Sequence, residues 1–229
     1  MKTIGLLGGM SWQSTALYYR LINEETNRRL GGLHSAQIAM VSVDFQEVET
    51  HQRNGDWRRA GEALAASATQ VEAAGAEMLL LCTNTMHKVA DEIENAISIP
   101  FLHIADATAE RIRQAGLTSI GLLGTQFTME QDFYRGRLEQ HGLKVFVPGA
   151  ADREIVHRVI YEELCQGTIR EDSRSEFVRI IKDLKSVGAE GVIQGCTEIV
   201  MLVDSMHTNV PLFDTTAIHA HAAVDAALE

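Results

Sequence analysis

Three short blocks of this sequence occur twice, in the same order, and this duplication limits the possible folds more than any other feature. The first block is TIGLLGGMSWQS near the start and SIGLLGTQFTME from Ser119. The second is GAEMLLLC, which ends at Cys82, and GAEGVIQGC, which ends at Cys196. The third is IPFLHIADAT from Ile99 and VPLFDTTAIH from Val210. The copies lie about 111 to 116 residues apart, which predicts two similar halves.

Within each copy, apolar runs rich in Ile, Val and Leu alternate with longer amphipathic segments. Continuous apolar strands that each precede a helix are typical of parallel sheets covered on both faces. We expect strands at Thr3–Leu7, Gln37–Val43, Glu77–Leu81, Phe101–Ile104, Ser119–Leu123, Lys144–Val147, Gly191–Gln194 and Leu212–Phe213. The expected helices are Ser14–Leu30, Trp57–Ala74, Met86–Ala96, Met129–His141, Arg153–Cys165, Ser173–Val187 and a final helix from Thr216. The predicted fold class is α/β, with two open parallel sheets that carry helices on both faces.

The repeat also predicts how the chain divides. We expect a first half made of residues 1–105 together with a returning C-terminal segment, 214–229, and a second half made of residues 106–213. A length of 229 residues suits one large α/β domain or two small ones. No Pro- or Ser-rich linker marks the boundary, so we expect the halves to pack tightly, related by a pseudo-two-fold axis.

Composition excludes several classes of partner. The net charge of −11, without a basic patch interleaved with aromatic residues, argues against nucleic-acid binding. No apolar run approaches the roughly 20 residues of a membrane span. The apolar run in MKTIGLLGGMSW is too short for a signal peptide. We therefore expect a cytoplasmic protein with reduced thiols, and its three cysteines do not suggest a zinc cluster.

Cys82 and Cys196 each follow a predicted strand directly. Ligands of open parallel sheets bind outside the carboxyl ends of the strands. If the two halves face each other, the two thiols therefore flank one ligand in one cleft. Glu198, two residues after Cys196, would oppose a thiolate there if its carboxylate turned inward.

The residues after Cys82 suggest how its thiolate could be favoured. Thr83, Asn84 and Thr85 are good capping residues for a helix that begins near Met86. The positive end of that helix would lower the pKa of the thiol. A base thiolate and an acid thiol on opposite faces of a carbon would remove one proton and add another from behind, which yields the mirror image.

Such a reaction passes through a carbanion, so the neighbouring carboxylate needs well-placed donors. The loops LLGGMSW and LLGTQFT could supply backbone N–H groups, and their glycines permit close approach. No Schiff-base lysine and no metal-binding set is evident. Cys82 and His87 lack a second ligand pair, and we expect His87 and Lys88 on a helix surface.

These motifs resemble those of the cofactor-independent amino-acid racemases of the aspartate/glutamate racemase superfamily, and especially the broad-specificity racemases of enteric bacteria. The resemblance rests on GLLGGMSW, CTNTMHK around Cys82 and GCTEI around Cys196, and it covers essentially the whole chain. It implies two Rossmann-like halves, an interdomain site and Cys82 and Cys196 as the catalytic pair. It also implies a free amino acid as substrate, no pyridoxal phosphate or other cofactor, and a homodimer.

Two positions differ from the pattern of the acidic-substrate members. Where these carry an Arg after the second strand, this chain has Gln52, with Arg53 adjacent; where they carry a Lys in the second half, Cys165 stands in IYEELCQG. Without these cations, we expect the site to bind a neutral substrate side chain better than a second carboxylate. The candidate substrate-binding residues are Met10, Gln52, Thr83, Asn84, Thr85, Thr125, Tyr161, Cys165 and Thr197.

Other functions remain open at this point. An aspartate/glutamate-specific racemase would use the same chemistry, and a hydantoin racemase would suit the missing cations. Maleate isomerases and arylmalonate decarboxylases are similar in fold, but a decarboxylase of this kind needs only one cysteine. A non-catalytic small-molecule binding protein would have little reason to keep both thiols in matching contexts.

Overall fold

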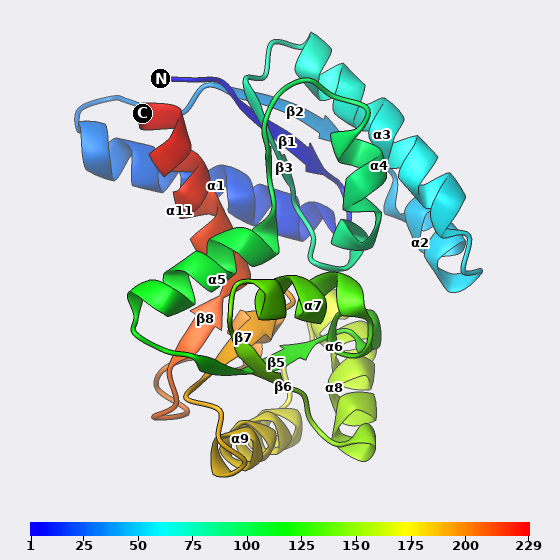
Figure 1. Cartoon of the computed structure of the whole chain (residues 1–229), viewed down its shortest axis with the longest axis vertical. Coiled ribbons are helices and arrows are strands. Elements are labelled where there is room, and N and C mark those ends of the chain that lie inside the picture. The colour runs from blue at the N-terminus through cyan, green and yellow to red at the C-terminus, as the bar shows by residue number, and fades with distance from the viewer. The chain divides into compact units, whose positions relative to one another are not determined.

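The computed structural model describes all residues, 1–229, and contains two four-stranded sheets (Figure 1). Every strand pair is parallel, and the order is β2-β1-β3-β4 in the first sheet and β6-β5-β7-β8 in the second. The strands are β1 (Ile4–Gly8), β2 (Ile38–Ser42), β3 (Met78–Leu81), β4 (Phe101–Leu102), β5 (Ser119–Gly124), β6 (Lys144–Phe146), β7 (Gly191–Gly195) and β8 (Leu212–Asp214). The same strand order in both sheets confirms the predicted fold class.

The chain forms two compact units, Met1–Ile104 with His219–Glu229, and Ala105–Ile218. Around the first sheet lie α1 (Trp12–Leu30), α2 (Phe45–Arg53), α3 (Trp57–Ala73), the 3₁₀ turn η1 (Thr85–Val89), α4 (Ala90–Glu94) and most of α11 (Thr215–Leu228). Around the second lie α5 (Ile104–Gln114), α6 (Gln126–Glu130), α7 (Asp132–Gln140), α8 (Ala150–Glu162), the 3₁₀ turn η2 (Leu164–Gln166), α9 (Glu171–Ser186) and α10 (Ile199–Leu202).

Both faces of the first sheet are buried. Alternate residues of β3 point to opposite faces, so Leu80 packs with α1 and α11 while Leu79 and Leu81 pack with α3 and α4. Figure 1 shows α11 (red) beside α1 (blue), where Ala220 and Val224 join the same apolar cluster. This two-sided burial is why β1 and β3 read as continuous apolar runs in the sequence.

The second unit repeats this layering with different contacts. One face of its sheet packs on α8 and α9 through residues such as Val192, Ile160 and Phe177, all fully or almost fully buried. Elsewhere in this unit a bidentate ion pair holds α7 to α5, because Nε and one terminal nitrogen of the Arg137 guanidinium donate to the two carboxylate oxygens of Asp106, each at 2.7 Å. Bidentate pairs of this kind fix orientation as well as distance.

The strands agree with the sequence predictions more closely than the helices do. All eight strands begin and end within two residues of their expected bounds. The expected helix Met86–Ala96 is instead η1 followed by α4, and Met129–His141 is α6 and α7 with an extended break at Gln131. The helices α2, α5 and α10 were not expected. A helix as short as α10, with four residues, carries little periodic signal, whereas the eleven residues of α5 are amphipathic and were missed directly after a predicted strand. None of the helices combines the length and apolar character needed to cross a lipid bilayer.

The end of β1 requires a glycine. A Cβ added at Gly8 would overlap the side chain of Thr15 in α1. The Thr15 hydroxyl is itself fixed, because it accepts a hydrogen bond from the Gly9 N–H at 2.8 Å and donates one to the Ser11 carbonyl at 3.0 Å. The glycine therefore permits a close approach of strand and helix within the fold.

We predict that Gly8→Ala lowers the free energy of unfolding by about 1–3 kcal/mol, the usual range for overpacking a core. Gly136→Ala is the matched control, since Gly136 lies inside α7 and its nearest neighbour to an added Cβ is 3.7 Å away. That variant should gain up to about 1 kcal/mol from the better helix propensity of alanine. Urea unfolding measures both, and equal stability of Gly8→Ala and the natural protein would show that the contact is not tight.

Candidate active site

In the first unit, Cys82 follows β3 and is fully buried. Its N–H donates to the Leu7 carbonyl and the Thr83 N–H donates to the Leu81 carbonyl, each at 2.9 Å. The side chain packs in the apolar cluster that contains Leu6 and Tyr18. Burial raises the pKa of the Cys82 thiol well above its ordinary value, so the resting group is a neutral thiol.

This finding contradicts the expectation that a helix would favour a Cys82 thiolate. The segment after Cys82 is the short 3₁₀ turn η1, and its N-cap Asn84 makes no side-chain capping hydrogen bond. A single turn has a small dipole, whereas complete burial penalises the charged sulfur fully. Desolvation therefore determines the resting state of this thiol.

The other predicted residues of the first unit lie near the carboxyl ends of β1 and β3 or on α2. Met10 follows β1 and packs with Leu7 and Leu81. On α2, Gln52 is buried, whereas the neighbouring Arg53 is exposed and its guanidinium lies 3.8 Å from the Glu49 carboxylate. After Cys82, Thr83 is half-buried, and Asn84 and Thr85 are buried.

Sequence reasoning missed His87, which was expected on a helix surface. The side chain is only 2% exposed. Its Nδ1 lies 2.7 Å from the Thr83 carbonyl oxygen, and its Nε2 accepts a hydrogen bond from the Ile104 N–H at 3.2 Å. The spacing of four residues from Thr83 was the available signal, because that spacing brings a side chain back over the preceding turn.

In the second unit, Cys196 follows β7, the strand equivalent to β3. Its Sγ donates a hydrogen bond to the Glu198 carboxylate at 2.8 Å, so this carboxylate does turn toward the thiol. Burial raises the pKa of Cys196 well above its ordinary value, and the negative charge of Glu198 adds to the effect. Thr197 receives a hydrogen bond from the Thr216 hydroxyl at 3.3 Å, which links the end of β7 to α11.

Two further predicted residues of the second unit lie at the end of α8. Tyr161 has its ring 4.8 Å from that of His157, one turn earlier. Cys165 is in η2 and is exposed, yet the protein around its sulfur and then the Glu198 charge raise its pKa to about 12. Charge on Cys165 would also raise the pKa of Cys196, so the two thiols lie close enough to influence each other's ionisation.

The glycine loops use several of the N–H groups that were expected to hold a substrate carboxylate. The Gly9 N–H donates to Thr15, as described above. After β5, Thr125 caps α6 by accepting from the Thr128 N–H at 3.4 Å, and the Gln126 N–H donates to His157 Nδ1 at 3.1 Å. These donors therefore stabilise the loops themselves. His157 is a second residue that sequence reasoning missed.

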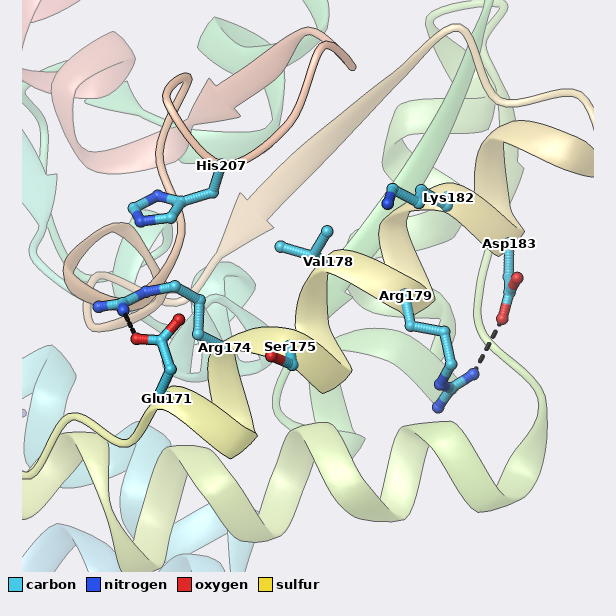
Figure 2. A pocket seen from close by; sticks show the side chains of 8 residues that line it. All are labelled: Glu171, Arg174, Ser175, Val178, Arg179, Lys182, Asp183 and His207. Atoms are coloured by element: carbon cyan, nitrogen blue, oxygen red, sulfur yellow. Dashed lines mark hydrogen bonds and ion pairs between the residues drawn. The ribbon is translucent and has the colours of Figure 1, made fainter.

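A charged groove of about 490 Å³ lies along α9 (Figure 2). Its charges are largely paired within the groove, because Arg174 binds Glu171 and Arg179 binds Asp183, as Figure 2 shows. None of its lining residues is a cysteine or follows a strand directly. Neither unit gathers three or more His, Cys, Asp or Glu side chains in an arrangement that could hold a metal ion.

We predict that Glu198→Gln lowers the pKa of Cys196, because the carboxylate both repels the thiolate and accepts the thiol proton. A shift of about one unit would give roughly tenfold more thiolate at any pH well below the pKa. The measurement is the pH dependence of Cys196 alkylation in a Cys165→Ser background, followed by mass spectrometry. Glu198→Asp keeps the charge and is the control. An unchanged alkylation profile in Glu198→Gln would contradict the electrostatic assignment.

Comparison with known proteins gives consistent matches along the chain. The sequence pattern of the family described as Asp/Glu/Hydantoin racemase matches residues 7–223. The broad specificity amino-acid racemase of Bacillus subtilis (strain 168) is 22% identical, with 96% of each chain covered. Among solved structures, a proposed Asp/Glu racemase from Yersinia pestis is 57% identical with a TM-score of 0.95. An aspartate racemase homologue from Pyrococcus horikoshii OT3 is 35% identical with a TM-score of 0.86, and both structures match over 100% of each chain.

Proposed function

The chain belongs to the Asp/Glu/hydantoin racemase family, and from this premise we propose that Cys82 and Cys196 are the two acid–base groups of a cofactor-independent amino-acid racemase. Membership confirms the resemblance predicted from the sequence motifs. With amino-acid and aspartate racemases among its relatives, the protein is an isomerase that acts on amino acids. The two-thiol mechanism and the breadth of specificity are the proposal.

The observation that carries the mechanism is the equivalence of the two cysteines. Cys82 directly follows β3 and Cys196 directly follows β7, and these strands occupy the same place in two sheets of the same order. Inversion at a carbon requires a base on one face and an acid on the other. Two thiols in equivalent positions provide the same chemical group for both roles, which suits a reaction that runs in both directions.

The proton transfers balance in a simple way. The thiolate sulfur takes the α-proton, and the electron pair of the C–H bond passes to the carbanion and its carboxylate. The opposite thiol then gives its proton to the carbon and becomes the thiolate. Because both resting thiols have raised pKa values, one of them must first release its proton to solvent. We propose that the positive ammonium group of the bound substrate stabilises the thiolate that this release leaves.

A neutral or broad side-chain preference is the second part of the proposal. Gln52 is buried while Arg53 points outward to Glu49, so the residue turned into the unit carries no charge. Cys165 provides no cation either. A second substrate carboxylate would then be desolvated without a partner, which costs free energy that an uncharged side chain avoids. The full set of proposed substrate-binding residues is Met10, Gln52, Thr83, Asn84, Thr85, Thr125, Tyr161, Cys165 and Thr197.

An aspartate/glutamate-specific racemase is the second candidate. The observation in its favour is the 35% identity to the aspartate racemase homologue of Pyrococcus horikoshii OT3, against 22% to the broad specificity enzyme of Bacillus subtilis. Both candidates use the same two thiols, so only side-chain preference separates them. Hydantoin racemase is included in the description of the matching family, but no relative reported above carries that name. Maleate isomerase and a non-catalytic binding role have no supporting observation.

We propose further that the protein is a cytoplasmic homodimer whose halves, 1–105 with 214–229 and 106–213, each contribute one thiol. An uncharged groove of about 390 Å³ between α1 and β2 supports self-association, because it exposes Trp12, Tyr19 and Met40. Exposed apolar patches of this kind are common at protein interfaces. A chain of net charge −11 would meet a copy of itself most favourably through an uncharged surface.

We predict that Cys82→Ser and Cys196→Ser each abolish racemisation while leaving the fold intact, because either change removes one of the two proton carriers. Each variant should still exchange the α-proton of one enantiomer with deuterated solvent, if the remaining thiol acts as base. Cys165→Ser is the control and should keep substantial activity. Full turnover by Cys196→Ser would rule out the two-base mechanism.

We predict a higher kcat/KM for at least one neutral amino acid, such as methionine, leucine or homoserine, than for aspartate or glutamate. The assay is chiral chromatography with both enantiomers at one pH, without added pyridoxal phosphate or metal. The double variant Cys165→Lys with Gln52→Arg should shift preference toward the acidic pair, because it supplies cations for a second carboxylate. Exclusive turnover of aspartate and glutamate by the natural protein would favour the second candidate instead.

A further inference from the structure

We propose that His87 is a positioning residue for Cys82: its imidazole fixes the Thr83 carbonyl and ties the turn that carries the thiol to the point where the chain leaves the first unit. The inference rests on the proposed function, since it assigns His87 a part in that reaction. The motif CTNTMHK joins the two residues in sequence, and the structure joins them through hydrogen bonds.

The partners of His87 determine its protonation state. A carbonyl oxygen only accepts, so Nδ1 donates its hydrogen to Thr83 at 2.7 Å. A backbone N–H only donates, so Nε2 accepts from Ile104 at 3.2 Å. Both bonds form together only in the neutral ring with its hydrogen on Nδ1. The imidazole therefore links two backbone positions in one defined orientation, inside a site where water has almost no access.

One end of this link is the turn that carries the thiol. Cys82 and Thr83 already donate their N–H groups to Leu7 and Leu81. These two bonds hold the peptide groups on both sides of the thiol. The bond from His87 adds the next carbonyl along the chain, that of Thr83, and so fixes the turn that follows the thiol. Because Cys82 is fully buried, the direction of its Sγ depends on this backbone and the packing around it.

The other end of the link lies where the chain passes from the first unit to the second; this point and the point of return are called the two crossings. Ile104 is the last residue of the first unit before the chain enters the second, and His219 is the first residue after it returns. His219 is also bound at both nitrogens, since Nε2 donates to the Leu102 carbonyl at 2.8 Å and Nδ1 accepts from the Tyr18 hydroxyl at 2.9 Å. Both crossings are thus held in the first unit by buried imidazoles whose ring centroids lie 6.1 Å apart.

Two substitutions of His87 each remove one of its two hydrogen bonds and keep the other. In His87→Asn the amide nitrogen lies close to the place of Nδ1, so it keeps the bond to Thr83 and loses the one to Ile104. In His87→Gln the amide oxygen reaches the place of Nε2, so it keeps Ile104 and loses Thr83. Each variant loses one buried hydrogen bond, so thermal unfolding should show similar destabilisation in both.

The kinetic test compares these variants in racemisation. His87→Gln should lose at least about tenfold in kcat with KM changed by less than about threefold, because a misdirected thiol slows proton transfer more than it weakens binding. His87→Asn should retain kcat within about threefold of the natural protein. Equal losses of kcat in the two variants, or a larger loss in His87→Asn, would overturn the positioning role and leave only a structural one.

A second measurement does not depend on racemase activity. In a Cys165→Ser/Cys196→Ser background, the rate at which methyl methanethiosulfonate modifies Cys82 reports how firmly the turn is held. His87→Gln should raise this rate at least about tenfold over His87→Asn, since local opening governs the access of a buried group. Tyr18→Phe is the control, because it removes a buried hydrogen bond from His219 without touching Thr83, and its rate should match that of His87→Asn.

The racemisation assay and the modification rate of Cys82 together separate failure of the proposed racemase function from failure of the positioning role of His87. If the natural protein fails to racemise any amino acid and the modification rates still differ as expected, the proposed function is wrong and the link from His87 to the Cys82 turn stands. If the natural protein racemises but Cys82 is modified at the same rate in both variants, the positioning role is wrong. Should His87→Gln fail to fold, a tenfold faster modification in His87→Asn than in Tyr18→Phe would still overturn it.

Discussion

The parallel sheet buried on both faces is the constraint on which the rest of this structure depends. Its strands satisfy their backbone groups in the ladder and give their side chains to apolar layers, so polar chemistry is confined to the strand ends. Cys82 and Cys196 occupy such ends, directly after β3 and β7. The close contact between Gly8 and Thr15 shapes another strand end, because it brings α1 against the end of β1 and makes the turn between them tight.

Burial has a chemical consequence that differs between the two thiols. For Cys82, loss of solvent alone raises the pKa. For Cys196, the carboxylate of Glu198 adds a negative charge and a hydrogen-bond acceptor. Both resting groups are neutral, and forming a thiolate costs free energy because the buried charge is poorly solvated. An ammonium group arriving with the substrate offsets part of this cost, which would couple substrate binding to activation in the proposed mechanism.

The histidines of the first unit show how polar groups are accommodated in such a core. His87 and His219 each donate from one nitrogen and accept at the other, and each has a main-chain partner. A buried imidazole with both nitrogens satisfied avoids the penalty of an unpaired polar group. It also fixes backbone positions far apart in the sequence, such as Thr83 and Ile104. These residues therefore form hydrogen bonds to the main chain close to both points where it passes between its units.

The sequence by itself determined the strands, the duplicated α/β fold and the family, because fully buried parallel strands leave continuous apolar runs and the repeat fixes their order. It also identified the two strand-end cysteines. Tertiary structure alone decided which side chains turn inward. Gln52 is buried and Arg53 is exposed, although the sequence did not indicate which of these two adjacent residues would face the core. The burial of His87 and the contact between Glu198 and Cys196 were decided in the same way. The physical reason is that orientation, burial and pKa depend on neighbours distant along the chain, which local sequence patterns do not contain.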